Sequence, residues 1–97
     1  MREAVIGDAL IKHGDDTGWF SRKMTYAGRR GCRDRDFYGF GHIVMMEIKR
    51  PGGKLCPHQE RERARMQAAG LKTHIIDDIE RGKALLDRLR DPANRGH

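Results

Sequence analysis

Two charged residues, Glu47 and Lys49, stand at the end of an otherwise apolar stretch of the chain. The stretch from His42 to Lys49 is too short and too continuous for an amphipathic helix, and Pro51 and the glycines after it predict a turn. It is therefore predicted to be a central strand buried on both faces. Because alternate residues of a strand share a face, the carboxylate and the amine should be neighbours.

A third charged residue, Asp34, lies upstream at the start of a second predicted strand. A hairpin between that strand and the Glu47 strand would bring two carboxylates together. Two close carboxylates repel unless a cation lies between them, and hard oxygen ligands suit Mg²⁺ or Mn²⁺. Such an ion can polarise a phosphate and lower the pKa of a bound water, while Lys49 orients that water or stabilises developing charge. The three residues predict metal-assisted phosphodiester hydrolysis, whereas Glu-x-Lys alone is more often an ordinary ion pair at a strand end.

Positive charge predominates, with 20 Lys and Arg against 14 Asp and Glu and a formal net charge of +6. A basic surface attracts polyanions, although a solvated surface can be basic without binding any. Six basic residues are concentrated between Ser21 and Arg35. Together with two residues after the Glu47 strand they are predicted to contact DNA phosphates. The predicted DNA-binding residues are Arg22, Lys23, Arg29, Arg30, Arg33, Arg35, Arg50 and Lys54.

The elements that must position these residues follow from periodicity and turn signals. A helix is predicted from Arg2 to His13, where Gly14-Asp15-Asp16 should stop it, and a strand is predicted over 19–26. A glycine- and arginine-rich loop over 28–41 should run into a second strand or hairpin. After the strand at 42–49, the sequence predicts a helix over 57–69, a strand over 72–76 and a helix over 79–89.

This order predicts one α/β domain over residues 1–90, a small mixed β-sheet flanked by helices, with a frayed polar tail at 91–97. Trp19, Phe37 and Tyr38 are expected in its core rather than stacked on bases. A 97-residue chain has a thin core, so a homodimer that covers an apolar face is a reasonable expectation. With no secretory or membrane-spanning segment, we expect a soluble cytoplasmic protein with reduced cysteines.

Taken together, these segments resemble the VRR-NUC nuclease domains of the PD-(D/E)XK superfamily, from about Glu3 to about Leu89. The resemblance is most specific in Arg29-Arg30-Gly31-Cys32-Arg33-Asp34-Arg35, in Glu47-Ile48-Lys49-Arg50-Pro51-Gly52-Gly53-Lys54-Leu55 and in the helix that Gln59 opens. The family usually has Gly-x-Pro-Asp where this chain has Gly31-Cys32-Arg33-Asp34. Arginine therefore replaces a proline that is not a ligand.

The resemblance implies a restriction-endonuclease-like core and an Mg²⁺- or Mn²⁺-dependent deoxyribonuclease. Small stand-alone members look like phage or bacterial homodimers that cut branched DNA such as four-way junctions. The implied metal ligands are Glu3, Asp34, Glu47 and the backbone carbonyl of Ile48, and the implied catalytic set is Asp34, Glu47, Lys49 and Gln59. Helical spacing agrees for Glu3, which shares a face with Ile6 and Leu10. The alternative for Glu3 is an acidic residue that is simply favoured by the helix dipole. The alternative for Gln59 is a solvated glutamine in the first turn of a helix.

Two other functions stay open. One is a non-catalytic nucleic-acid-binding module, in which the basic loop grips phosphates and the carboxylates pair with arginine; it predicts no metal dependence. The other is structural zinc held by Cys32, His42, Cys56 and His58, although Cys56-Pro57-His58 lacks the usual ligand spacing.

Overall fold

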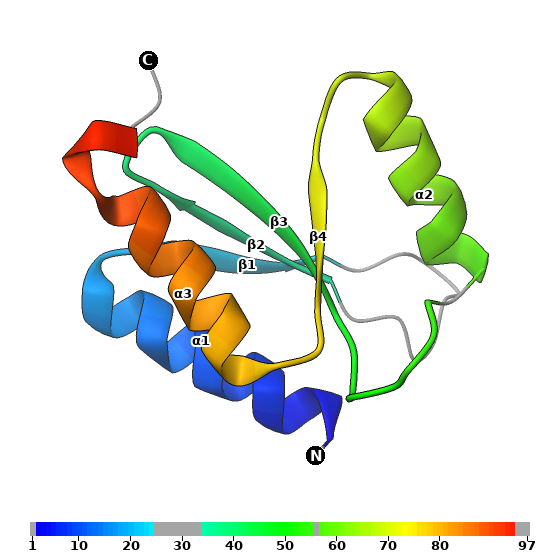
Figure 1. Ribbon diagram of the computed structural model, residues 1–97, viewed down its shortest axis with the longest axis horizontal. Helices are drawn as coiled ribbons and strands as arrows, with labels where there is room; N and C mark the ends of the chain where they lie inside the picture. Colours follow the sequence, from blue (N-terminus) through cyan, green and yellow to red (C-terminus); the bar gives the residue numbers. More distant parts are fainter. Residues whose placement is uncertain (1, 25–33, 56, 95–97) are drawn as a thin grey trace.

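The helices and strands follow one another in the predicted order (Figure 1). The computed structural model describes residues 2–24, 34–55 and 57–94, and for Met24, Asp34, His58 and Asn94 it describes the backbone. The elements in these residues are α1 Glu3–Thr17, β1 Phe20–Met24, β2 Asp34–Gly39, β3 His42–Ile48, α2 Pro57–Ala68, β4 Thr73–Ile76 and α3 Ile79–Arg90. A short 3₁₀ helix, Pro92–Asn94, follows within the predicted tail.

The strands form one mixed sheet in the order β1-β2-β3-β4. β2 pairs antiparallel with both β1 and β3, whereas β4 pairs parallel with β3. A parallel pair needs a crossover, and α2 provides it. α1 and α3 contact each other and lie together on one face of the sheet (Figure 1). The fold is therefore the predicted α/β layer arrangement.

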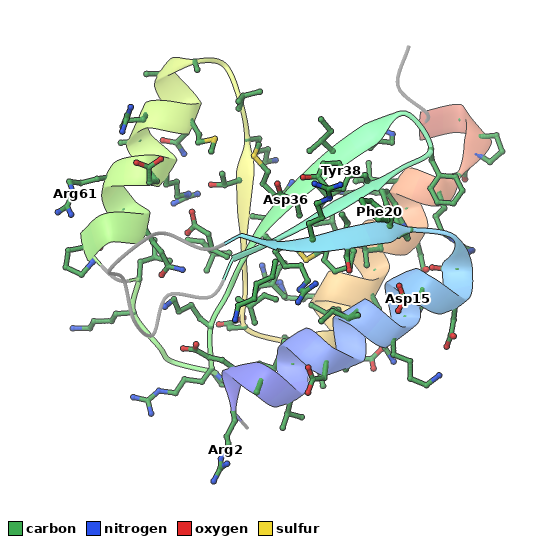
Figure 2. All side chains as sticks on the ribbon, turned by 180° about the vertical axis from the view of Figure 1, so that it is seen from behind. Arg2, Asp15, Phe20, Asp36, Tyr38 and Arg61 are labelled. Atoms are coloured by element: carbon green, nitrogen blue, oxygen red, sulfur yellow. The ribbon has the colours of Figure 1, made fainter. Side chains whose placement is uncertain are left out.

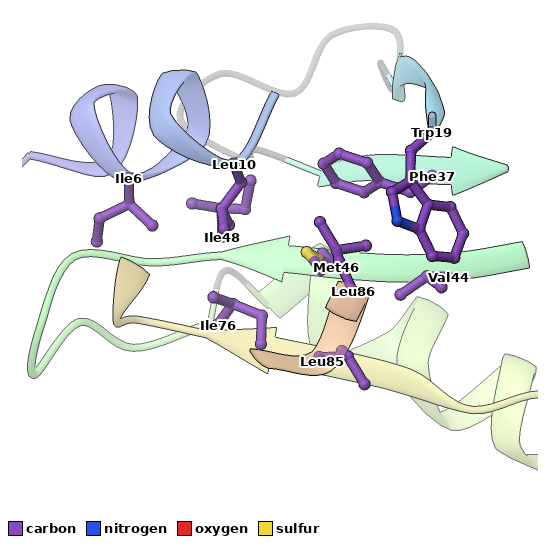
Figure 3. Close-up of a cluster of buried hydrophobic side chains, with 10 residues drawn as sticks. All are labelled: Ile6, Leu10, Trp19, Phe37, Val44, Met46, Ile48, Ile76, Leu85 and Leu86. Atoms are coloured by element: carbon purple, nitrogen blue, oxygen red, sulfur yellow. The ribbon is translucent and has the colours of Figure 1, made fainter. Parts of the chain in front are cut away.

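The hydrophobic core lies between the sheet and the α1–α3 layer (Figure 3). Val44, Met46 and Ile48 of β3 are buried and meet the fully buried Ile6 and Leu10 of α1. On the other face of β3, however, Ile43 is 65% exposed. The prediction that β3 is buried on both faces is therefore wrong at the Ile43 end, because α1 and α3 cover one face only, whereas Glu47 on the face of Ile43 is buried.

Helix α1 continues to Thr17, past the predicted stop at Gly14. Gly14 is buried, and a Cβ atom there would lie 3.0 Å from the Phe37 ring, so the glycine serves close packing rather than termination. Lys12 and Asp16 form an ion pair of 2.9 Å across the extra turn. Gly18 caps the end of the helix and adopts the left-handed conformation with φ of 99°.

A two-residue turn, Phe40-Gly41, joins β2 to β3. Both residues have positive φ, 53° and 80°, as tight hairpins require. Phe40 is a strained choice for this conformation, but its ring packs edge-on against Trp19 with centroids 5.0 Å apart. The turn sets Gly39 opposite His42 and thereby the register of the whole β2–β3 pair.

Candidate active site

The predicted hairpin between the Asp34 and Glu47 strands is present, and it places these two residues directly opposite each other. Direct partners in an antiparallel pair share a face, with Cβ atoms about 4.5–5.5 Å apart. Glu47 is only 5% exposed and its Oε2 atom is buried. A carboxylate in such a position is costly unless charge or hydrogen bonds compensate it.

Lys49 follows directly after β3 and extends its ladder, because its backbone N–H donates to the Ile76 carbonyl at 2.8 Å. Its side chain is 3% exposed, and Nζ lies 3.9 Å from Oε1 of Glu3. Ile6 and Leu10 on the same face of α1 are fully buried, which confirms the predicted helical stripe. The structure thus brings Glu3 and Lys49 together at the end of β3.

Gln59 and Ile48 contribute in different ways. Gln59 lies in the first turn of α2 and is 1% exposed, so the alternative of a solvated surface glutamine is wrong. The Ile48 side chain is in the core on the face away from Glu47. Only the backbone carbonyl of Ile48 therefore fits the ligand role that the resemblance implies.

The predicted basic patch is divided between the two faces of the sheet. The register places Arg22 on the face of Asp34 and Glu47, where its guanidinium lies 5.3 Å from the centroid of the Phe20 ring. Arg35 occupies the opposite face, and its Nη1 atom donates to Ser21 at 3.3 Å. Lys23 is on that face too. The predicted DNA contacts Arg29, Arg30 and Arg33, like Cys32 and Cys56 of the zinc alternative, lie outside the described residues.

Arg50 and Lys54 are exposed in the segment between β3 and α2. Arg50 lines a hollow of about 510 Å³ together with Arg2, which directly precedes Glu3. Two arginines therefore border the end of the sheet at which Glu3 and Lys49 meet. Such a border favours the approach of a polyanion.

Asp36 is a carboxylate that the sequence analysis missed. It lies two residues after Asp34 on the same face of β2, and it accepts a hydrogen bond of 2.9 Å from the Tyr38 hydroxyl. Burial raises the pKa of Asp36, and the hydrogen bond from Tyr38 opposes that rise. Tyr38 was expected in the core, but it lies on the face that α1 and α3 leave open. The alternation Asp34, Asp36, Tyr38 was the signal that could have revealed both placements.

The donor set at this site consists of oxygen atoms. Among the side chains that the structure describes, no three from His, Cys, Asp and Glu gather closely enough to hold a metal ion, and the Asp34 side chain is not one of those described. Two carboxylates in register and a backbone carbonyl match the hard ligands of Mg²⁺ and Mn²⁺ rather than the nitrogen and sulfur ligands typical of zinc.

Comparisons with known proteins give one informative similarity. No family model matches the chain. A protein of Acyrthosiphon pisum secondary endosymbiont phage 1, named "Putative nuclease p44", is 36% identical over 78 residues. The match covers 79% of this chain and 84% of the phage protein, so it spans most of both. None of the helices within the described ranges is long and apolar enough to cross a membrane.

Proposed function

The chain belongs to the same nuclease family as this phage protein, and we propose that it is a metal-dependent DNA endonuclease of the PD-(D/E)XK type with its centre at Asp34, Glu47 and Lys49. The observation that supports this most strongly is the direct pairing of Asp34 with the buried Glu47. A buried lysine two residues further along the chain, directly after β3, completes the arrangement. Such burial is costly to stability, which favours a functional reason for it.

Each residue has a distinct part in the proposed reaction. Asp34, Glu47 and the carbonyl of Ile48 would hold the ion, with Glu3 close by. Bound Mg²⁺ or Mn²⁺ would supply charge neutralisation at the scissile phosphate and lower the pKa of a water molecule. Lys49, held near Glu3 at 3.9 Å, would donate to the phosphate oxygens as negative charge develops on them. Gln59 would border the site from the first turn of α2.

We further propose that the DNA is selected by shape, with branched molecules such as four-way junctions preferred. A chain of 97 residues has little surface with which to read base edges. The described members of the predicted DNA-binding set are spread over both faces of the sheet and the loop after β3, where they can contact backbones that run in different directions. Phosphate contacts of this kind recognise geometry rather than sequence.

A homodimer is the proposed assembly, and an apolar row on the open sheet face supports it. Phe20, Tyr38 and Ile43 are register partners across β1, β2 and β3. Phe20 is 55% and Ile43 65% exposed, and the rings of Phe20 and Tyr38 are 5.8 Å apart. Figure 2 shows Phe20 and Tyr38 on the side of the sheet away from α1. A second copy that covered this row would bury apolar surface that a small domain otherwise leaves in water.

The decisive experiment compares Glu47→Gln with the wild type on a labelled four-way junction and on the matching linear duplex. Mg²⁺, Mn²⁺ and EDTA are tested in parallel. Glu60→Gln, at an exposed position in α2, is the matched control. We expect wild-type cleavage only with metal and a loss of about 10²- to 10³-fold in Glu47→Gln, because an essential charge at the reacting phosphate is removed. Circular dichroism should show that both variants are folded.

Two results would count against parts of this proposal. Binding without cleavage under every metal condition would support a non-catalytic nucleic-acid-binding module. Equal cutting of linear and branched DNA would remove the proposed shape selectivity while leaving the nuclease centre in place.

A further inference from the structure

A basic cleft of about 550 Å³ lies along β4, one of the two edge strands of the described sheet, and is lined by residues from both α2 and α3. Figure 1 shows β4 between these two helices. The floor of this β4 cleft includes the buried side chains of Ile76 and Leu85. Its cationic residues come from α2, from the loop before β4 and from α3. They are Arg63, Lys72, Arg81 and Arg88.

Arg81 is already engaged by the fold. Its Nη1 atom lies 3.0 Å from Oδ1 of Asp77, and its Nη2 atom donates to the Ile75 carbonyl at 3.5 Å. The charge of Arg81 is thus largely neutralised, and its side chain links α3 to β4. None of the described residues that line the β4 cleft is acidic. The other cationic residues that line it are Arg63, Lys72 and Arg88.

Arg63, Lys72 and Arg88 all affect the charge of the His74 imidazole. Burial lowers the pKa of His74 in β4, and Lys72, Arg88 and Arg63 lower it further by repulsion. Arg63 is held over β4 by a hydrogen bond of 3.2 Å from its Nε atom to Oγ1 of Thr73. Like charges that are held together in this way raise the free energy of the molecule, and a bound anion would relieve the repulsion.

We propose that the β4 cleft binds a phosphodiester segment of the nucleic acid on which the Glu47 centre acts. This inference rests on the proposed function, because it takes the substrate of that centre as the ligand. Ile75 lines the cleft and is the register partner of Glu47 on the neighbouring strand, and neighbouring strands lie about 4.8 Å apart. Guanidinium forks and a lysine ammonium are the donors that suit phosphate.

The test measures binding in EDTA, where no cleavage occurs, by fluorescence anisotropy of a labelled duplex and a labelled four-way junction. Arg63→Ala/Lys72→Ala is compared with Arg61→Ala/Arg65→Ala. Both doubles remove two positive charges, but Arg61 and Arg65 are exposed on α2 outside the cleft (Figure 2 labels Arg61). We expect about 10-fold weaker binding in the cleft double and a salt slope reduced by about 2, since each lost phosphate contact changes it by about 0.9.

Arg63→Ala removes the hydrogen bond to Thr73 and could disturb the fold. A second pair of variants therefore leaves Arg63 in place. Lys72→Glu reverses one exposed charge at the cleft, and Arg61→Glu reverses one outside it. Only Lys72→Glu should weaken binding strongly. A loss on both DNAs would place a flanking backbone in the cleft, and a loss on the junction alone would place a second arm there; either supports the proposal.

Equal affinity and equal salt slope in the cleft and control variants would overturn the proposal. Cleft-dependent binding of a polyglutamate peptide in that case would identify an acidic protein segment as the ligand instead. Failure of the proposed nuclease activity would be visible separately, as wild-type protein that binds DNA in EDTA but does not cut it when metal is added.

Discussion

At the residue scale, the burial of Glu47 and Lys49 decides how their short motif is interpreted. Both side chains are almost completely buried, and Lys49 lies near the partly exposed Glu3. A solvated ion pair at a strand end would stabilise the protein by at most about 1 kcal/mol and would need no burial. The burial therefore separates these two residues from the ordinary surface pair that their spacing alone could equally have produced.

His74 provides a prediction on pH dependence. Its pKa is lowered in the folded protein by burial and by nearby cations, so the unfolded chain binds more protons as the pH falls through 6.5. Stability from His74 is thus present above pH 6.5 and lost as the pH falls toward the lowered pKa. Because His74 is only half-buried, solvent screening keeps the loss of stability small. Urea unfolding of the wild type and of His74→Gln between pH 5 and 7.5 should show a flatter profile in the variant.

Salt is the control for this prediction. Repulsion from Lys72, Arg88 and Arg63 is screened by added ions, so 0.5–1 M NaCl should reduce the difference between the two profiles. Identical pH profiles for the wild type and His74→Gln at low salt would contradict the argument.

At the scale of elements, the Phe40-Gly41 turn has a consequence for the distant site. It sets the β2–β3 register in which Asp34 faces Glu47 at the other end of the pair. A slip of one residue would turn every side chain of one strand to the opposite face. The buried positions Val44, Met46 and Ile48 oppose such a slip, because they would have to exchange places with residues on the open face.

Two helical glycines should respond oppositely to alanine. At Gly82 of α3 a Cβ atom would lie 2.6 Å and 2.8 Å from the Leu10 methyl groups, and Leu10 is fully buried. Gly82→Ala should cost about 1–2 kcal/mol through overpacking. At Gly7 of α1 the nearest atom would be Cδ1 of Ile48 at 3.6 Å, an ordinary contact, so Gly7→Ala should stabilise by about 0.5–1 kcal/mol.

Thermal unfolding by circular dichroism would measure both variants, since 1 kcal/mol corresponds to roughly 4–8 °C in a domain of this size. Shifts of Tm in the same direction for Gly82→Ala and Gly7→Ala would show that the α1–α3 contact is not as close as the structure places it.

At the scale of the whole molecule, α1 and α3 cover one face of the sheet, and an apolar row lies exposed on the other face. Phe20, Tyr38 and Ile43 form this row four residues along β2 from Asp34, roughly 14 Å away. A dimer formed through it would therefore keep the proposed active site outside the centre of the contact. Two sites in one assembly would suit a substrate with two strands to cut.

Ile43→Asp should convert the proposed dimer into a monomer, because it places a charge in the centre of the apolar row. Light scattering coupled to gel filtration would report the mass of each species. Val5→Asp is the matched control, since Val5 is 49% exposed on α1, away from the row. A monomeric wild type, or equal masses for the wild type and Ile43→Asp, would refute a dimer through this surface.

The sequence alone was sufficient to predict the order of the elements and the β2–β3 hairpin, because periodicity and turn residues are local signals. It was less reliable at element ends. The predicted stop at Gly14 was wrong because this glycine is required for close packing against the Phe37 ring. That ring is distant in the sequence and lies close only after folding. The same limit applied to β3, whose burial on a second face depended on where the helices pack.

For the site, residue types and spacing were enough to single out Asp34, Glu47 and Lys49, and the family resemblance added Glu3 and Gln59. Only the tertiary structure decided that Asp34 faces Glu47, that Glu3 meets Lys49 and that Gln59 is buried. It also gathered Arg63, Lys72 and Arg88 into one cleft, which no spacing in the chain suggested. Strand and helix periods determine which residues share a face, whereas the meeting of faces depends on packing between segments that are remote along the chain.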